Sequence, residues 1–148
     1  MSTRQGQGIT GCSNYLKNTL LPSVTSIRIT NIFDNELTDL AGFPAATITV
    51  MEQDGKPIDN CRNERIYRFT IRVFIDRNAK NFGSAKAETV LRTVADEITL
   101  LVDGDPTLGG NCIYVKPFVA KFGYVDRESN NLRVMEITLE CEDVVSWR

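Results

Sequence analysis

The clearest pattern in the chain is a strict alternation of apolar and polar positions over residues 65–77. One face of this segment carries Tyr67, Phe69, Ile71, Val73 and Ile75. The other face carries Ile66, Arg68, Thr70, Arg72 and Phe74. Because successive side chains of a β-strand point to opposite faces, the alternation predicts a long strand whose first face enters the core.

Further stretches show the spacing of strands. After Phe43-Pro44, the residues Ala46, Ile48 and Val50 alternate with Thr47, Thr49 and Met51. Residues 132–142 place Met135, Ile137, Leu139 and Cys141 on one face and Val134, Glu136, Thr138 and Glu140 on the other. Extended segments are also predicted for residues 24–33, with Ile27 and Ile29 on one face, and for residues 111–125. In the latter, Pro117 indicates an edge or a bulge.

Apolar residues spaced three and four apart predict two helices. The first begins at Ile9, and Pro22 ends it within about a turn. Its stripe is Ile9, Cys12, Leu16 and Leu20. The second runs from about Ser84, a suitable N-cap, to Val102. Its stripe is Ala87, Val90, Leu91, Val94, Ala95, Ile98 and Leu101, and its exposed side carries a Glu88–Arg92 pair worth about 0.3 kcal/mol.

The order of these elements indicates an α+β fold, in which two helices pack on one face of a mostly antiparallel sheet. A chain of 148 residues is long enough for one domain with a core, which we assign to residues 9–148. Residues 1–8 are rich in Gly, Gln, Ser and Thr, and we expect a flexible N-terminus there.

Composition excludes several classes of function. The 17 basic and 19 acidic residues give a net charge of -2, which argues against nucleic acid as the main ligand. No apolar run approaches the roughly 20 residues that cross a bilayer, and the N-terminus lacks the order of a signal peptide, so we expect a cytoplasmic product. The chain has no histidine, which excludes Ser-His-Asp and Cys-His catalysis. We therefore expect no enzyme activity and no catalytic residue.

The four cysteines are Cys12, Cys61, Cys112 and Cys141. No two of them have CxxC spacing, so the sequence indicates neither a zinc site nor a redox dithiol. Buried reduced thiols are the simple interpretation. We accordingly expect no metal and no cofactor.

The stretch "DGDPTLGGNC", residues 103–112, is the one segment that suggests an ion or phosphate site. As an EF-hand it fails, because the sixth position is Leu108 and the twelfth is Tyr114. As a P-loop it fails because its glycines follow a helix and precede a strand. We interpret it as a helix stop at Gly104 followed by a turn.

Two groups of side chains are candidates for a partner surface. Arg68 and Arg72 share the outer face of one strand, and Glu136 and Glu140 share the outer face of another. If the strands are neighbours, these residues form cross-strand ion pairs, although contact with a second subunit is an alternative. Their placement leads to the hypothesis that Arg72→Glu disturbs assembly more than folding.

The second candidate group is aromatic. Phe43, Phe74 and Trp147 lie on segments that we expect to be exposed or at an edge. Together with a sheet face left uncovered by helices, they indicate an oligomer or partner surface. The alternative is that a loop or a terminus folds over them.

The order of several short motifs resembles the tail terminator (tail completion) proteins of long-tailed bacteriophages, from about Leu16 to Val145. The motifs are "GFPAATITV", "RIYRFTIRVFI", "AETVLRTVADEITLLVDGDPTLGG", "GYV" and "RVMEITLEC". The resemblance implies a structural virion protein assembled in the host cytoplasm. Its copies form a ring, typically a hexamer, at the head-proximal end of the tail tube, where the ring stops tube polymerisation and joins the head.

The partners implied by the resemblance are other copies of the chain, the tail tube protein and a head–neck connector, with DNA passing only transiently through the lumen and no membrane contact. A neck connector or head-completion protein is the alternative within this class. A small metal-binding protein or carboxylate enzyme using Asp103 and Asp105 is the alternative outside it. The expected contact elements are the loops Asp34–Gly42, Gln53–Asn63, Asn78–Gly83 and Asp126–Asn131.

Overall fold

The alternating segments form neighbouring strands in a computed structural model, which describes residues 2–4, 6–25, 29, 31–33, 44–76, 84–116, 120–127 and 130–147. The described residues form the strands β1 (Ser2–Arg4), β2 (Asn31–Phe33), β3 (Ala45–Pro57), β4 (Arg62–Asp76), β5 (Tyr114–Lys116), β6 (Ala120–Arg127) and β7 (Asn130–Trp147). The α-helices are α1 (Gly8–Tyr15) and α2 (Ser84–Gly104). A π-helical turn (Leu16–Leu20) and a 3-10 turn (Leu21–Ser23) continue α1.

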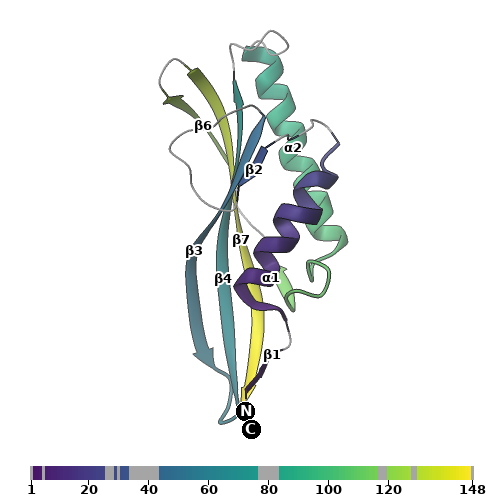
Figure 1. The fold of residues 1–148 in the computed structure, drawn as a ribbon, viewed down its shortest axis with the longest axis vertical. Coiled ribbons are helices and arrows are strands. Elements are labelled where there is room, and N and C mark those ends of the chain that lie inside the picture. Colours follow the sequence, from purple (N-terminus) through teal and green to yellow (C-terminus); the bar gives the residue numbers. More distant parts are fainter. Residues whose placement is uncertain are drawn as a thin grey trace.

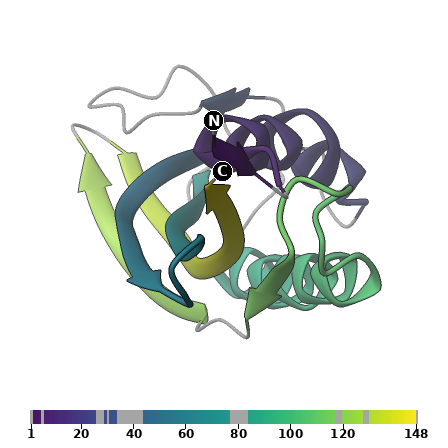
Figure 2. The same ribbon diagram turned by 90° about the horizontal axis from the view of Figure 1, so that it is seen from below.

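The strands join into one sheet in the order β1-β7-β4-β3-β2, with β5 and β6 also paired to β7. All of these pairings are antiparallel except that of β2 with β3. Both helices pack on the same side of the curved sheet (Figures 1 and 2). The predicted α+β class, with two helices on one face of a mostly antiparallel sheet, is confirmed.

The core lies between the helices and the predicted inner faces of β4 and β7. It buries Tyr67, Phe69, Ile71, Val73 and Ile75 of β4 with Met135, Ile137, Leu139 and Cys141 of β7. From α2 it buries Leu91, Val94, Ala95 and Ile98. Phe69 is fully buried, and truncation of such a phenylalanine to alanine typically costs about 3–5 kcal/mol. Neither α-helix of the described residues is long and apolar enough to span a membrane.

The first predicted helix also has the expected buried stripe. Cys12, Leu16 and Leu20 are buried, and Ile9 packs against the core cluster. The helical path continues past Tyr15, and Pro22 lies in the 3-10 turn that ends it. Proline lacks the N–H that a further helical turn would use, which accounts for the stop.

The N-terminal segment differs from the expected flexible tail. Ser2–Arg4 forms β1, which pairs with residues 145–147 at the end of β7. The buried Gly6 N–H donates a 2.7 Å hydrogen bond to Asp143 Oδ1. An unpaired strand edge and a buried carboxylate both need backbone partners, and the N-terminal residues supply them.

The structure of residues 53–63 differs more clearly from the sequence-based prediction. We expected Gln53–Asn63 to be a loop, but β3 extends to Pro57 and β4 begins at Arg62. A register shift between Val50 and Glu52 marks a bulge. The turn is short, because Ile58 and Asp59 both donate their N–H groups to Arg62 O at 2.9 and 3.3 Å. The prediction of a loop here was wrong because polar residues also form a strand when its partner strand is adjacent.

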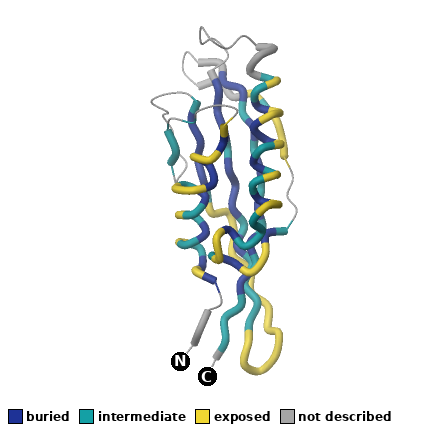
Figure 3. The backbone as a smooth tube through the Cα atoms, turned by 90° about the vertical axis from the view of Figure 1, so that its right-hand side faces the viewer, coloured by how far each residue is buried: buried dark blue, intermediate teal, exposed yellow. Residues whose placement is uncertain are grey.

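This β3–β4 hairpin reaches beyond the helices, near both chain ends (Figure 1). Every residue from Val50 to Arg62 is exposed (Figure 3). The extended segment predicted for residues 24–33 is reduced to Asn31–Phe33 among the described residues, and Ile27 lies outside them. The end of β7 and β1 accompany the hairpin in this projection, because β7 pairs with β4 as far as Arg62 and with β1 at residues 145–147.

Candidate functional site

The outer face of the sheet, opposite the helices, carries the ion pairs expected from the sequence. Arg68 Nε lies 2.9 Å from Glu140 Oε1, and Arg72 Nε lies 3.0 Å from Glu136 Oε2. In both cases the two residues are directly opposite each other on β4 and β7. The strands are neighbours, so the predicted cross-strand pairing is confirmed.

These pairs extend into rows of alternating charge, which we call the charge ladder (Lys116, Glu140, Arg68, Glu52, Arg72 and Glu136). Arg68 Nη1 lies 2.9 Å from Glu52 and 2.6 Å from Asp54, on β3. On the other edge, Lys116 is opposite Glu140 and lies 2.8 Å from Glu142 Oε1. Hydrogen bonds with Asp54 and Glu140 raise the pKa of Arg68, so its guanidinium remains a cation throughout the physiological range.

The charge ladder is partly solvent-accessible, so its contribution to folding is modest. The side chains of Arg68 and Arg72 are 26% and 23% exposed, and comparable surface pairs contribute about 0.2–1 kcal/mol. Its main consequence is a fixed pattern of charge on the outer face of the sheet. Any partner that docks there must match this pattern, since unpaired charges would otherwise be desolvated.

The aromatic candidates are distributed differently from the prediction. Phe74 is only 3% exposed and packs with Ala45 and Leu132 in a second small cluster, so the expected exposure of Phe74 was wrong. The partly buried Phe33 and Val134 pack against this cluster. Ala45 and Val134 lie directly opposite Phe74 on the neighbouring strands. Phe43 and the side chain of Trp147 lie outside the described residues.

The predicted contact loops are only partly described. Asp34–Gly42 and Asn78–Gly83 lie outside the described residues. In Asp126–Asn131, the first two residues end β6 and the last two begin β7, with Asp126 opposite Asn131. The loop between β6 and β7 is therefore shorter than expected, because the strands are still paired at Arg127 and Asn130.

An exposed aromatic pair on β6 was not anticipated. Phe122 and Tyr124 are 40% and 64% exposed, and their ring centroids lie 5.8 and 4.3 Å from the guanidinium carbon of Arg133. The sequence shows the two rings at i,i+2 in "KFGYV", a spacing that places them on one face of a strand. Their cationic neighbour became apparent only from the pairing of β6 with β7.

The tip of the β3–β4 hairpin is ordered by its own polar groups. Asp59 accepts hydrogen bonds from Cys61 N and from Arg62 Nε, both at 2.8 Å. The Arg62 hydrogen bond is the main reason that the pKa of Asp59 is lowered. Met51 and Ile58 on this hairpin are 56% and 47% exposed. A cleft of about 320 Å³ on the same hairpin is lined by Asp54, Gly55, Lys56, Glu64 and Ile66.

The stretch from Asp103 to Cys112 forms a helix end and a turn, as predicted. Asp105 accepts hydrogen bonds from Thr107 Oγ1 and Gly109 N, both at 2.8 Å, and from Tyr15 Oη at 3.4 Å. Leu108, Gly109 and Gly110 have φ angles of 50, 68 and 84°. The Asp105 carboxylate is thus engaged in closing the turn and in fastening it to α1.

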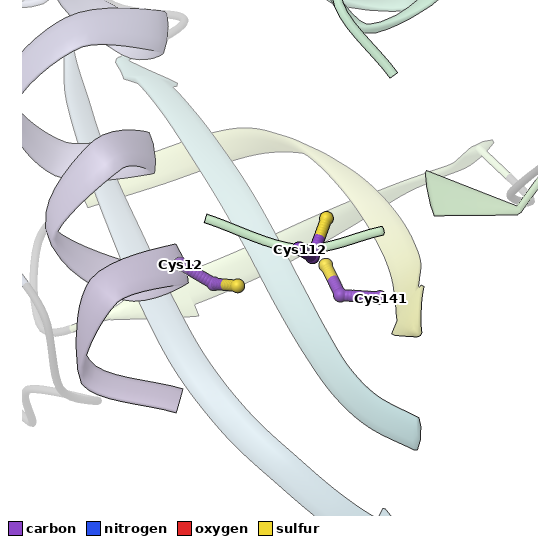
Figure 4. A group of neighbouring side chains, drawn as sticks. All are labelled: Cys12, Cys112 and Cys141. Atoms are coloured by element: carbon purple, nitrogen blue, oxygen red, sulfur yellow. The ribbon is translucent and has the colours of Figure 1, made fainter. Parts of the chain in front are cut away.

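The cysteines depart most from the sequence-based interpretation. Cys12, Cys112 and Cys141 are buried, but they are not independent, since their Sγ atoms all lie within 4.8 Å of one another (Figure 4). Cys61 is exposed at the hairpin, so the expectation of burial was wrong for this residue. The three buried thiols form the one cluster of potential metal ligands found among the described residues. No spacing rule could reveal it, because each cysteine comes from a different element.

No protein-family model matches the chain, and no curated protein sequence matches it. Among solved structures, the fold is similar to a chain in the "Virion of native gene transfer agent (GTA) particle". The TM-score is 0.42 at 12% sequence identity, and the match covers 89% of this chain and 90% of that chain. A similarity of this degree does not assign a function to this chain.

Proposed function

We propose that the protein is a structural component of a phage virion, whose copies form a ring that caps the tail tube at its head-proximal end. The ring ends tube polymerisation and offers the surface that joins the head. The observation that carries this proposal is the β3–β4 hairpin, which is exposed from Val50 to Arg62. The motif resemblance to tail terminator proteins supports the same assignment.

The hairpin leaves a sheet edge open, because residues 48–57 of β3 pair with β4 but with no other described strand. The hairpin also exposes Met51 and Ile58, which are 56% and 47% accessible. Both features favour contact with another molecule. A ring requires such a contact to be heterologous, so that the hairpin of one copy meets a different surface of the next.

Two further surfaces are suited to receive a partner. The charge ladder runs across the outer face of β3, β4, β7 and β5, and the aromatic pair Phe122 and Tyr124 lies on β6. Aromatic residues are enriched at protein interfaces, and matched charges give orientation and specificity. Several distinct patches are what a subunit needs if it contacts its own copies, the tube protein and a head–neck connector.

The proposed role is not enzymatic. The chain has no histidine, and its net charge of -2 suits a ring through which DNA passes without being held. The Asp105 carboxylate is used within its turn rather than presented to a substrate. The proposed function therefore depends on the surfaces through which the protein binds its partners and not on a catalysed reaction.

The test combines native mass measurement with tail assembly in the absence of this protein. We expect purified chain at micromolar concentration to form a closed oligomer, and tails assembled without it to be overlong. Tubes of normal length that fail to join heads would instead identify a neck connector. A strict monomer that does not bind purified tail tubes would contradict both assignments.

A further inference from the structure

Three cysteines far apart in the sequence converge in the core. Cys12 comes from α1, Cys112 from the turn before β5, and Cys141 from β7. They are 0%, 4% and 0% exposed, and their Sγ atoms lie within 4.8 Å of one another. Figure 4 shows Cys12 pointing from its helix toward the other two. Packing as small apolar side chains explains the burial of each cysteine, but it does not require their sulfur atoms to meet.

The backbone around the cluster holds this arrangement. Gln7 N donates to Asn111 O at 2.8 Å, which joins the start of α1 to the turn. Ile113 N donates to Glu142 O at 2.8 Å, which joins the turn to β7. The hydrogen bonds flank Cys12, Cys112 and Cys141, so the sulfur atoms are positioned before any ligand arrives.

The three Sγ atoms are close enough for one cation to contact all of them. A bound cation would stabilise several thiolates at once.

We propose that Cys12, Cys112 and Cys141 form a thiolate site for a soft metal ion with a filled d shell, either Zn²⁺ or Cu⁺. Metal–sulfur bonds of about 2.3 Å place sulfur atoms roughly 3.8–4.0 Å apart. The observed upper limit of 4.8 Å therefore requires only a small contraction. Soft thiolate ligands select these ions. Each ligating thiol releases its proton to solvent, and the ion keeps its oxidation state.

The available fourth ligand distinguishes the two ions. The chain has no histidine. The nearby buried Asp143 accepts hydrogen bonds from Gly6 N at 2.7 Å and from Val144 N at 2.8 Å. The Asn111 carbonyl oxygen is in direct contact with the cluster, since it accepts from Cys12 Sγ at 3.5 Å as well as from Gln7 N at 2.8 Å. Zn²⁺ would use this oxygen or a water to complete a tetrahedron, whereas Cu⁺ would need the three sulfur atoms alone.

A surface hollow is lined by the residues that directly precede Cys12 and Cys112. Its volume is about 510 Å³, and its lining includes Gly11 of α1 and Asn111. Asn111 thus borders the hollow and also contacts the Cys12 thiol. A bound ion would connect α1, the turn after α2 and β7, and would add to the backbone hydrogen bond that already joins the start of α1 to the turn.

The test titrates the reduced, metal-free full chain separately with Zn²⁺ and with Cu⁺ against chromophoric chelators. We expect one ion per chain in the wild type and in the matched control Cys61→Ser. We expect loss of binding in Cys12→Ser, Cys112→Ser and Cys141→Ser. Preference for Zn²⁺ identifies the four-coordinate form, and preference for Cu⁺ identifies the three-coordinate form.

A second measurement does not require the cluster variants to fold. Alkylation of the wild type in mild denaturant, read by mass spectrometry, should show metal-dependent protection of three thiols but not of Cys61. Absence of stoichiometric binding by the wild type would overturn the proposal. Binding that survives Cys141→Ser but is lost in Cys61→Ser would also overturn it. So would a disulfide within the cluster that forms readily in a chain that binds neither ion.

Discussion

Arg133 of β7 holds Glu88 of α2 through two hydrogen bonds, Nε to Oε2 at 2.7 Å and Nη2 to Oε1 at 3.0 Å. The arginine side chain is only 9% exposed. Its Nη1 also donates to Gly123 O of β6 at 2.8 Å, and its guanidinium lies 4.3 Å from the Tyr124 ring centroid. One side chain therefore links a helix, a central strand and an edge strand.

Replacement of Arg133 should accordingly weaken the fold. We expect Arg133→Met to lower the free energy of unfolding by about 1–3 kcal/mol, because buried charged hydrogen bonds are lost. Arg92→Met is the matched control, since Arg92 contacts the same Glu88 at 3.3 Å but is 69% exposed. Urea unfolding measures both variants. Equal effects of the two substitutions would contradict this role of Arg133.

The Arg72–Glu136 pair permits a test that separates folding from assembly. Arg72→Glu would place two carboxylates opposite each other, where the ion pair now measures 3.0 Å, so the single reversal acts on folding as well as on assembly. We expect the double reversal Arg72→Glu with Glu136→Arg to recover about 0.5–1 kcal/mol of that loss. Native mass measurement of the double variant then reads assembly alone. If the double variant forms normal rings, the Arg72–Glu136 pair is not part of the proposed subunit contact.

The turn after α2 should respond differently to alanine at two of its glycines. Gly109 has a φ of 68°, and an added Cβ would lie 2.7 Å from the Tyr15 ring. We expect Gly109→Ala to cost at least about 1–2 kcal/mol. Gly104→Ala, which meets nothing within 4 Å, should leave stability unchanged or slightly raised. Thermal unfolding of both variants measures the difference, and a neutral Gly109→Ala would contradict the geometry of the turn.

Asp105 gives the same turn a defined pH dependence. A hydrogen bond from Thr107 is the main cause that lowers the pKa of Asp105 below its ordinary value of 3.8. A folded-state pKa below the unfolded one contributes stability that is complete above 3.8 and is lost as the pH falls through the lowered value. We expect Asp105→Asn to be less stable than the wild type at neutral pH, with the difference shrinking in acid. The exposed Asp103→Asn is the control, and a pH-independent difference for Asp105→Asn would refute the linkage.

The hairpin can be tested by charging its exposed apolar residues. We expect Met51→Lys and Ile58→Lys to melt as the wild type does but to fail to form rings, because a lysine would be buried at the contact. Leu100→Lys is the control, since Leu100 is 70% exposed on α2. Labelling of the exposed Cys61 should also slow on assembly. Rings that form normally with both hairpin variants would exclude the hairpin as the subunit contact.

The secondary structure and the core followed from local patterns. Period two identified the inner faces of β4 and β7, and helical spacing identified the buried stripes of α1 and α2, because one-sided burial imposes these periods. The cross-strand pairs of Arg68 and Arg72 were also anticipated, since an alternating strand places them on one face. The turn at Asp105 was recognised from the order of helix, glycines and strand.

Other features depended on which segments meet. The sequence alone determined the two helices, the inner faces of the long strands and the residues of the main core, because these follow from the apolar period of each segment. Only the tertiary structure decided the length of the β3–β4 hairpin, the burial of Phe74, the Arg133–Glu88 link and the convergence of Cys12, Cys112 and Cys141. Those contacts join residues up to about 130 positions apart. Their formation depends on strand register and helix docking, which no local spacing encodes.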